Sequence, residues 1–306
     1  MSLPLFDTPR FPDTVAVIGL GAMGRGFARH LLDAGFTVRG CDLDPARLAQ
    51  FVAWGGVASE SPADAATGAG TVLTSLPKHE HVVDVLFGPD GVQQGSHPGQ
   101  LVIDTSTSLP QQSRALADRL AAAHVRFLDA SVSGTGATVM EKDVVVLVGG
   151  DSRDYLEATR LFEAFSRRSY HLGPVGSGAL GKLIINVVVV GNRLALAEGL
   201  NFGLASGMDG ATLLQILKDG PTYSRAMDLK GGKMVTGDYR PDSTLAQSLA
   251  GTTLLLAQAQ ELGVPLFLTA LYSQVAQAGV NLGFGPADPA ALIEALKALS
   301  RRDVEA

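Results

Sequence analysis

Cysteine is nearly absent from this chain of 306 residues, which contains only Cys41. A single cysteine excludes an internal disulfide and fits a reducing compartment, so we expect a cytoplasmic protein. Basic residues are also scarce, with 24 Lys and Arg against 30 Asp and Glu. Because the formal net charge is −6 and no basic stripe runs along the sequence, we do not expect nucleic acid as a partner.

Signals for a membrane are missing as well. The first thirteen residues lack the cationic start and the apolar centre of a signal peptide. The apolar run at 183–192 is too short to span a bilayer, so no membrane partner is expected. Apolar residues nevertheless make up 46% of the chain, which indicates a large core and a buried interface between subunits.

Short β-branched runs alternate with helical patterns in the first part of the chain. They predict strands at 14–20, 36–42, 70–77, 101–107, 126–133, 143–150 and 169–173, and helices at 24–35, 45–55, 80–87, 111–123 and 152–166. This alternation implies an α/β fold with a parallel sheet and helices on both of its faces.

The pattern changes at the glycine-rich segment 173–178, after which every periodic segment is helical. These segments predict helices at 178–206, 209–218, 221–231, 242–262, 265–280 and 288–301. We therefore predict two domains, an α/β domain over 12–173 and an all-α domain over 174–302.

A glycine-rich turn joins the first strand to the first helix. Gly19, Gly21 and Gly24 have the G-x-G-x-x-G spacing, which is informative here because it follows an apolar strand and opens a helix. The glycines permit a tight turn, the approach of backbone N–H groups to a pyrophosphate, and close packing of the helix. The alternative is that they only punctuate a turn. We predict a doubly wound, Rossmann-type domain whose cofactor-binding loop consists of Gly19, Leu20, Gly21, Ala22, Met23 and Gly24.

Asp42 ends the second predicted strand and indicates which dinucleotide binds. A carboxylate at this place accepts hydrogen bonds from the adenosine ribose and repels a 2′-phosphate, so NAD is favoured over NADP. Arg39 and Arg47 stand nearby and leave NADP open as the second choice.

Two later strands also end in residues suited to a ligand. Leu76 and Pro77 follow one strand and Thr107 follows another, at the carboxyl edge where open α/β sheets bind ligands. The alternative is that Pro77 is a loop residue and Thr107 a helix cap.

The segment 129–137, "DASVSGTGA", forms a Ser/Gly/Thr turn after a strand. Ser133, Gly134 and Thr135 would present backbone N–H groups and hydroxyls, which form a suitable cradle for a carboxylate. The alternative is an ordinary glycine loop.

Lys182 stands at the start of an apolar helical run, with Asn186 one turn further on the same helix face. Packing would partly desolvate this amine and lower its pKa toward neutrality, where it can exchange a proton. The alternative is a lysine whose stem covers the core while its ammonium stays in water. The glycines before Lys182 and the dinucleotide domain beside it favour the first interpretation.

Three segments together resemble the β-hydroxyacid dehydrogenases, which include 3-hydroxyisobutyrate, tartronate-semialdehyde and L-threonate dehydrogenases. They are "VIGLGAMGRGFARHLLDAGFTV", "DASVSGTGA" and "GSGALGKLIIN", and residues 40–56 look most like the L-threonate branch. The resemblance implies that Lys182 is the general acid/base for a 3-hydroxyl and that Asn186 orients the substrate. It also implies that Ser133, Gly134 and Thr135 hold the substrate carboxylate. Leu76, Pro77 and Thr107 would then line the nicotinamide half of NAD, and no metal is expected.

Some positions depart from the pattern of that family. Lys142 and Asp143 replace a usual Gly-Thr, and Ala250 and Gly251 replace a Lys-Asp pair whose lysine reaches the cofactor. These changes leave two alternatives open, an imine-type reductase on the same scaffold and a catalytically silent nucleotide-binding protein. The apolar helices of the second domain predict a homodimer or homotetramer.

Overall fold

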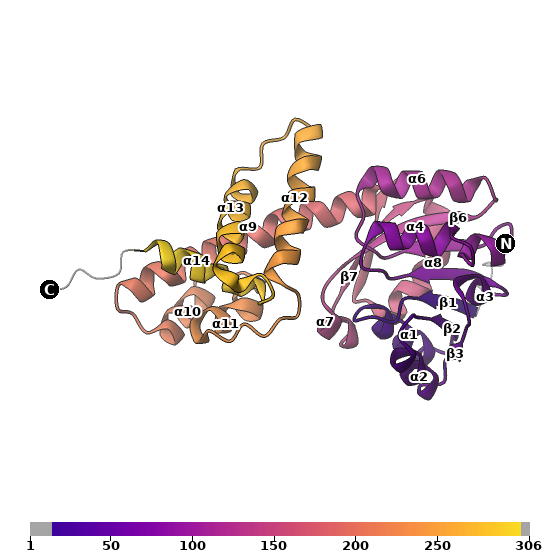
Figure 1. The fold of residues 1–306 in the computed structure, drawn as a ribbon, viewed down its shortest axis with the longest axis horizontal. Coiled ribbons are helices and arrows are strands. Elements are labelled where there is room, and N and C mark those ends of the chain that lie inside the picture. Colours follow the sequence, from indigo (N-terminus) through magenta and orange to yellow (C-terminus); the bar gives the residue numbers. More distant parts are fainter. Residues whose placement is uncertain (1–13, 301–306) are drawn as a thin grey trace, which may run out of the picture. The chain divides into compact units, whose positions relative to one another are not determined.

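The computed structural model describes residues 14–300 of the chain (Figure 1). Several predictions therefore lie outside the described residues: the missing signal peptide, the domain ends at 12 and 302, and the helix end at 301. The described chain forms two compact units, one up to Lys182 and one from Leu183 onward.

The first unit is built on one eight-stranded sheet with the order β3-β2-β1-β4-β5-β6-β7-β8. Its strands are β1 (Thr14–Ile18), β2 (Thr37–Cys41), β3 (Val57–Ala58), β4 (Thr71–Thr74), β5 (Leu101–Asp104), β6 (Arg126–Ser133), β7 (Val145–Gly150) and β8 (Arg168–Gly173). The chain winds first to one side of β1 and then, from β4, to the other. This reversal confirms the doubly wound fold and creates a crevice beyond the carboxyl ends of β1 and β4.

Helices cover both faces of this sheet (Figure 1). They are α1 (Gly24–Asp33), α2 (Pro45–Ala53), α3 (Pro62–Ala66), α4 (His79–Phe87), α5 (Val92–Gly95), α6 (Pro110–Ala121), α7 (Gly136–Met140) and α8 (Ser152–Phe165). Alternate residues of β1 enter two separate cores, Val15 and Val17 on one face and Ala16 and Ile18 on the other. A strand buried on both faces reads as a continuous apolar run, which is why β1 was recognisable in the sequence.

One strand runs against the expected direction. β7 pairs antiparallel with β6, whereas every other neighbouring pair in the sheet is parallel. The segment between them, 134–144, holds only the five-residue α7. This connection is too short for the crossover that a parallel pair needs, so the chain turns back directly. The short elements β3, α3, α5 and α7 were also missed by the sequence prediction.

The second unit is helical, as expected, although the long α9 (Ser177–Ala205) begins in the first unit. Its other elements are α10 (Gly210–Asp219), α11 (Gly232–Thr236), α12 (Leu245–Glu261), α13 (Phe267–Gly279) and α14 (Leu292–Leu299), with π-helical turns η1 (Met227–Gly231) and η2 (Val280–Phe284) and a 3₁₀ turn η3 (Pro289–Ala291). The helix predicted at 221–231 was wrong in its first turn. There the Thr222 hydroxyl donates to the Leu217 carbonyl oxygen at 2.7 Å and closes a turn instead.

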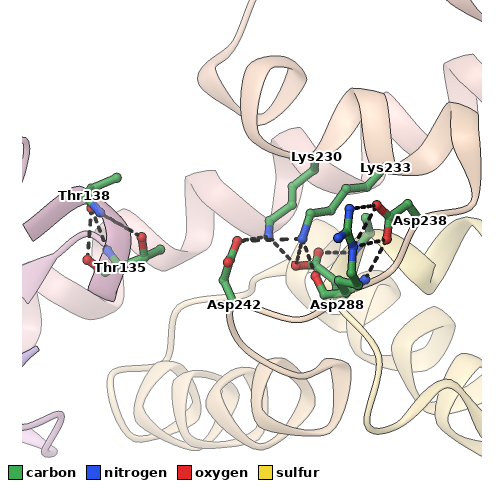
Figure 2. Close-up of polar contacts among 9 residues, drawn as sticks. Thr135, Thr138, Lys230, Lys233, Asp238, Asp242 and Asp288 are labelled. Atoms are coloured by element: carbon green, nitrogen blue, oxygen red, sulfur yellow. Dashed lines mark hydrogen bonds and ion pairs between the residues drawn. The ribbon is translucent and has the colours of Figure 1, made fainter. Parts of the chain in front are cut away.

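A partly buried ion cluster links η1 and α11 to the start of η3 in the second unit (Figure 2). The fully buried Asp288 carboxylate accepts hydrogen bonds from Lys230 Nζ at 2.7 Å and Lys233 Nζ at 2.9 Å. It also caps η3 by accepting the Ala290 N–H at 3.0 Å. Asp242 approaches both lysines at 3.9 and 3.7 Å. Charges and hydrogen bonds are thus paired, as a buried carboxylate requires.

One departure from the family pattern, Lys142 in place of a usual glycine, lies just after α7. Lys142 adopts a φ of 55° in the left-handed region, which glycine occupies without steric cost. A side chain at such a position costs about 1 kcal/mol.

We expect Lys142→Gly to be more stable than Lys142→Ala by about 1 kcal/mol, because only alanine keeps the strained Cβ. The comparison cancels the loss of the lysine side chain, and urea unfolding of both variants measures it. Equal stability, or a more stable alanine variant, would contradict a strained backbone at this position.

Two aspartates stand side by side at the carboxyl edge of the sheet. Asp104 of β5 pairs in register with Thr74 of β4 and with Asp129 of β6. The buried Asp104 carboxylate accepts hydrogen bonds from Thr74 Oγ1 at 2.8 Å and from the Ser106 N–H at 3.0 Å. Burial, aided by the nearby Asp129, outweighs these bonds and raises the pKa of Asp104 to about 6.

Because the pKa of Asp104 is higher in the folded than in the unfolded chain, its contribution to stability is lost as pH rises through about 6. We therefore expect the wild type to lose up to about 3 kcal/mol relative to Asp104→Asn between pH 4 and pH 7. Urea unfolding of both proteins across this range checks the expectation. Parallel stability profiles would show that the carboxyl group does not titrate as described.

Candidate active site

A cavity of about 240 Å³ opens in the first unit beyond the carboxyl ends of several strands. Loops after β1, β4, β5 and β6 contribute to it, together with the first turn of α1 and the second turn of α9. Its lining comprises Met23, Phe27, Ser75, Leu76, Pro77, Thr105, Ser106, Thr107, Val132, Gly134 and Lys182. The cavity therefore lies at the sheet edge where this fold class binds ligands.

Lys182 brings an amine into the cavity. Its Nζ donates a hydrogen bond to the Val132 carbonyl oxygen at 2.7 Å. Burial lowers the pKa of Lys182 to about 8, because the ammonium form loses its hydration. Among the described residues of the lining, Lys182 is the one titratable side chain. A neutral amine is thus accessible near physiological pH.

The loops after β4 and β5 form the opposite part of the lining. Leu76, Pro77 and Thr107 lie in the cavity wall, in the same cavity as Lys182. The Ser106 hydroxyl accepts the Leu76 N–H at 3.0 Å and so ties the two loops to each other. Ser75, Thr105 and Ser106 were not singled out from the sequence, although they stand in the same strand ends, "TSLP" and "DTST".

The Ser/Gly/Thr turn is only partly brought to the cavity. Gly134 belongs to the lining, while Ser133 and Thr135 do not. Thr135 caps α7: its N–H donates to Thr138 Oγ1 at 2.8 Å and its hydroxyl accepts the Thr138 N–H at 3.3 Å (Figure 2). Helix caps and anion-binding turns both contain Ser, Thr and Gly, so the sequence alone does not distinguish the two.

The glycine loop has the geometry that a diphosphate needs. Gly19 has a φ of +90°, and a Cβ there would lie 2.3 Å from the Ser75 carbonyl oxygen. A Cβ on Gly24 would lie 1.8 Å from the Gly19 oxygen. At Gly21 the nearest atom would be Arg47 Nη1 at 3.9 Å, so its face stays open for a ligand. No side chain caps α1, and an uncapped helix N-terminus after a glycine-rich turn is suited to bind a phosphate.

Asp42 braces this loop from the end of β2. Its carboxylate accepts the Leu20 N–H at 2.6 Å and the Asp44 N–H at 2.8 Å. Arg47 Nη1 lies 3.6 Å from the same carboxylate. Arg39 is bound instead to Asp64 at 2.9 Å, so Arg47 is the arginine that stands at the loop. The residues present fit a dinucleotide.

Three predicted or noted positions lie in the second unit. Asn186 follows Lys182 by one turn of α9. Ala250 is exposed on α12, and the helix continues unbroken through Gly251, where a Cβ would meet no atom within 4 Å. Over residues 14–300, no group of three or more His, Cys, Asp or Glu side chains is arranged to hold a metal ion.

Both units match known families. Residues 14–173 match the NAD binding domain of 6-phosphogluconate dehydrogenase, and residues 176–296 match the NAD-binding domain of NADP-dependent 3-hydroxyisobutyrate dehydrogenase. The chain is 33% identical over 281 residues to the L-threonate dehydrogenase of Cupriavidus necator, covering 92% of this chain and 95% of that protein.

Solved structures agree with this assignment. The 3-hydroxyisobutyrate dehydrogenase of Salmonella typhimurium superposes with a TM-score of 0.84 at 26% identity, covering 92% of this chain and 99% of that one. An imine reductase from Pseudomonas sp. has a TM-score of 0.63 at 23% identity over 93% and 99% of the two chains, and shares the fold alone. The chain belongs to the β-hydroxyacid dehydrogenase family and is an oxidoreductase that uses NAD or NADP.

Proposed function

We propose that this enzyme oxidises a small 3-hydroxy acid, or reduces the corresponding semialdehyde, with Lys182 as the general acid/base. The observation that carries the proposal is the partly buried Lys182 amine, which lines the cavity that the cofactor-side residues Leu76, Pro77 and Thr107 also line. Its family relatives named for L-threonate and 3-hydroxyisobutyrate support a short hydroxy acid as substrate. With its diphosphate on the glycine loop, a bound dinucleotide would supply the nicotinamide that accepts the hydride from the substrate's 3-carbon.

Hydride loss from an alcohol requires that a proton leave the oxygen at the same time. A neutral Lys182 amine can donate one N–H to the Val132 oxygen and still direct its lone pair at the substrate hydroxyl. During oxidation the hydroxyl proton moves to Nζ, and in the reverse reaction Nζ returns it to the carbonyl oxygen. The Val132 contact therefore fixes the amine in both states.

The other roles are those that the resemblance to the family implies. Ser133, Gly134 and Thr135 hold the substrate carboxylate, with the Gly134 backbone supported by its place in the cavity lining. Asn186, one turn after Lys182, orients the substrate. Asp42 faces the adenosine ribose and favours NAD, while the neighbouring Arg47 makes NADP the second choice. We place the enzyme in the cytoplasm, in keeping with its single cysteine.

Lys182→Ala should lower kcat for oxidation by about 10²–10⁴-fold, because the proton acceptor is lost. In the wild type, kcat/KM for oxidation should rise with pH through about 8 and then level off, while that for reduction should fall. The measurement follows NADH or NADPH absorbance with a panel of 3-hydroxy acids that includes L-threonate and 3-hydroxyisobutyrate.

Lys218→Ala is the matched control, since Lys218 is paired with Asp228 in the second unit and should leave turnover unchanged. Retained activity in Lys182→Ala would refute the role of the amine. Tight NADH binding without turnover of any hydroxy acid or imine would favour the silent nucleotide-binding alternative, to which Ala250 in place of the usual lysine points.

We further propose that the helical unit forms a homodimer or homotetramer. Large apolar side chains are exposed on α9, α12 and α13: Ile184, Val188, Val189, Phe202, Leu254, Phe267, Leu268 and Leu271. α9 is long and apolar enough to cross a membrane, although the core helices of soluble proteins can be so too. Only 33% of its most apolar 18-residue stretch is buried. α9 also contains the charged residues Lys182, Arg193 and Glu198, which are costly to place in a bilayer. We therefore expect a second copy of the protein, and not lipid, to pack against its exposed apolar side chains.

Light scattering at micromolar concentration should give the mass of a dimer or tetramer for the wild type. Phe267→Glu should lower that mass, because Phe267 is 81% exposed and a carboxylate resists burial in an interface. Leu156→Glu, at a side chain 69% exposed on α8 of the first unit, should leave the mass unchanged. A monomeric wild type would contradict the proposed assembly.

A further inference from the structure

The Asp129 carboxylate of β6 is buried against the first turn of α9. One oxygen accepts the Gly176 N–H at 2.7 Å and the other accepts the Ala179 N–H at 2.8 Å. A carboxylate that takes backbone N–H groups at the start of a helix satisfies donors that have no partner inside the helix. Asp129 thus attaches α9 to the sheet at the point where α9 begins.

Glycines make the room for this carboxylate. A Cβ on Gly149 would lie 2.5 Å from Asp129 Oδ1, and one on Gly178 would lie 2.9 Å from Oδ2 and 2.5 Å from the Asp129 backbone oxygen. Gly176 has a φ of +95°, which brings its N–H round to the carboxylate. The glycine-rich segment at the domain junction is therefore shaped around Asp129.

The reactive lysine is on α9, close to Ala179, and its hydrogen-bond partner Val132 is on β6, the strand of Asp129. Lys182 lies three residues after Ala179 on α9, and Val132 lies three residues after Asp129 on β6. The Lys182 Nζ binds the Val132 carbonyl oxygen. Strand and helix are consequently joined at two points, and the Asp129 contact fixes the backbone from which the lysine side chain extends.

We propose that Asp129 is the positioning residue of the active site, which holds Lys182 Nζ at the Val132 carbonyl by fixing the first turn of α9. Asp129 does not line the cavity, so it acts through the lysine and touches no substrate. The catalytic consequence rests on the proposed role of Lys182, whereas the positioning itself does not.

Few charged groups surround Asp129. From β5 its register partner Asp104 faces it, held by Thr74 and Ser106. From β7 the register partner is Gly149, and from α9 the contacts are backbone N–H groups. Burial raises the pKa of Asp129 and these N–H groups oppose the rise. Loss of the carboxylate charge therefore acts mainly on the α9 contact.

The test is Asp129→Asn in the full chain, with Lys182 reactivity read without cofactor or substrate. Competitive acetylation with acetic anhydride, followed by mass spectrometry, gives the pKa of Lys182 from the pH dependence of labelling. The amide can accept only one of the two N–H groups, those of Gly176 and Ala179, so the start of α9 loosens and the lysine gains water. We expect the pKa of Lys182 to rise by at least one unit from about 8, which lowers the neutral fraction of the amine at pH 8 about fivefold or more. A similar fall in kcat and an unchanged KM for NAD should accompany it.

Asp154→Asn is the matched control, because it removes a buried carboxylate bound to Arg126 at the start of the same strand. It should lower stability without moving the pKa of Lys182. Gly178→Ala is a second variant that keeps Asp129 but pushes the first turn of α9 away, and it should raise the pKa of Lys182 as well.

An unchanged pKa of Lys182 in both folded variants would overturn the proposal, even if kcat fell, because the effect would then be general destabilisation. A raised pKa in Asp129→Asn alongside normal turnover in Lys182→Ala would uphold the positioning and refute the proposed function.

Discussion

The hydrogen bond from Lys182 Nζ to the Val132 carbonyl oxygen is the contact on which the active site depends. A buried ammonium without an acid partner is costly, and the cavity lining offers no carboxylate to hold its proton. A neutral amine can satisfy the carbonyl with one N–H and keep a free lone pair. Because burial disfavours the charged ammonium form, it lowers the pKa of Lys182 and makes the amine a base near neutral pH.

Three aspartates around the sheet edge organise the backbone near this lysine. Asp42 accepts the N–H of the glycine loop, Asp104 that of the loop after β5, and Asp129 those of the first turn of α9. Asp42 follows the end of β2 and Asp104 ends β5, while Asp129 lies within β6 in register with Asp104. Carboxylates that accept backbone N–H groups thus connect elements that are distant in sequence. The rigid edge offers pre-organisation for a reaction that needs close alignment.

Much of this arrangement could be predicted from sequence because it has a local signature. The strand–helix alternation, the glycine fingerprint and Lys182 at the head of an apolar helix are all patterns within short segments. The Asp129 contacts join residues 47 and 50 positions apart, so no pattern within a short segment of the sequence predicts them. The Val132 partner is a main-chain carbonyl, which any residue possesses. The direction of β7 and the cap role of Thr135 depended on the short connection between strands.

The pKa of the Lys182 amine in the unliganded wild type tests the account most directly. Lysine labelled with ¹⁵N at the ε position gives one NMR signal for each amine, and the signal absent from Lys182→Met identifies the residue. Burial without an acid partner predicts titration near pH 8. A Lys182 signal that titrates above pH 10 with the surface lysines would contradict the claim that this buried amine carries the proton.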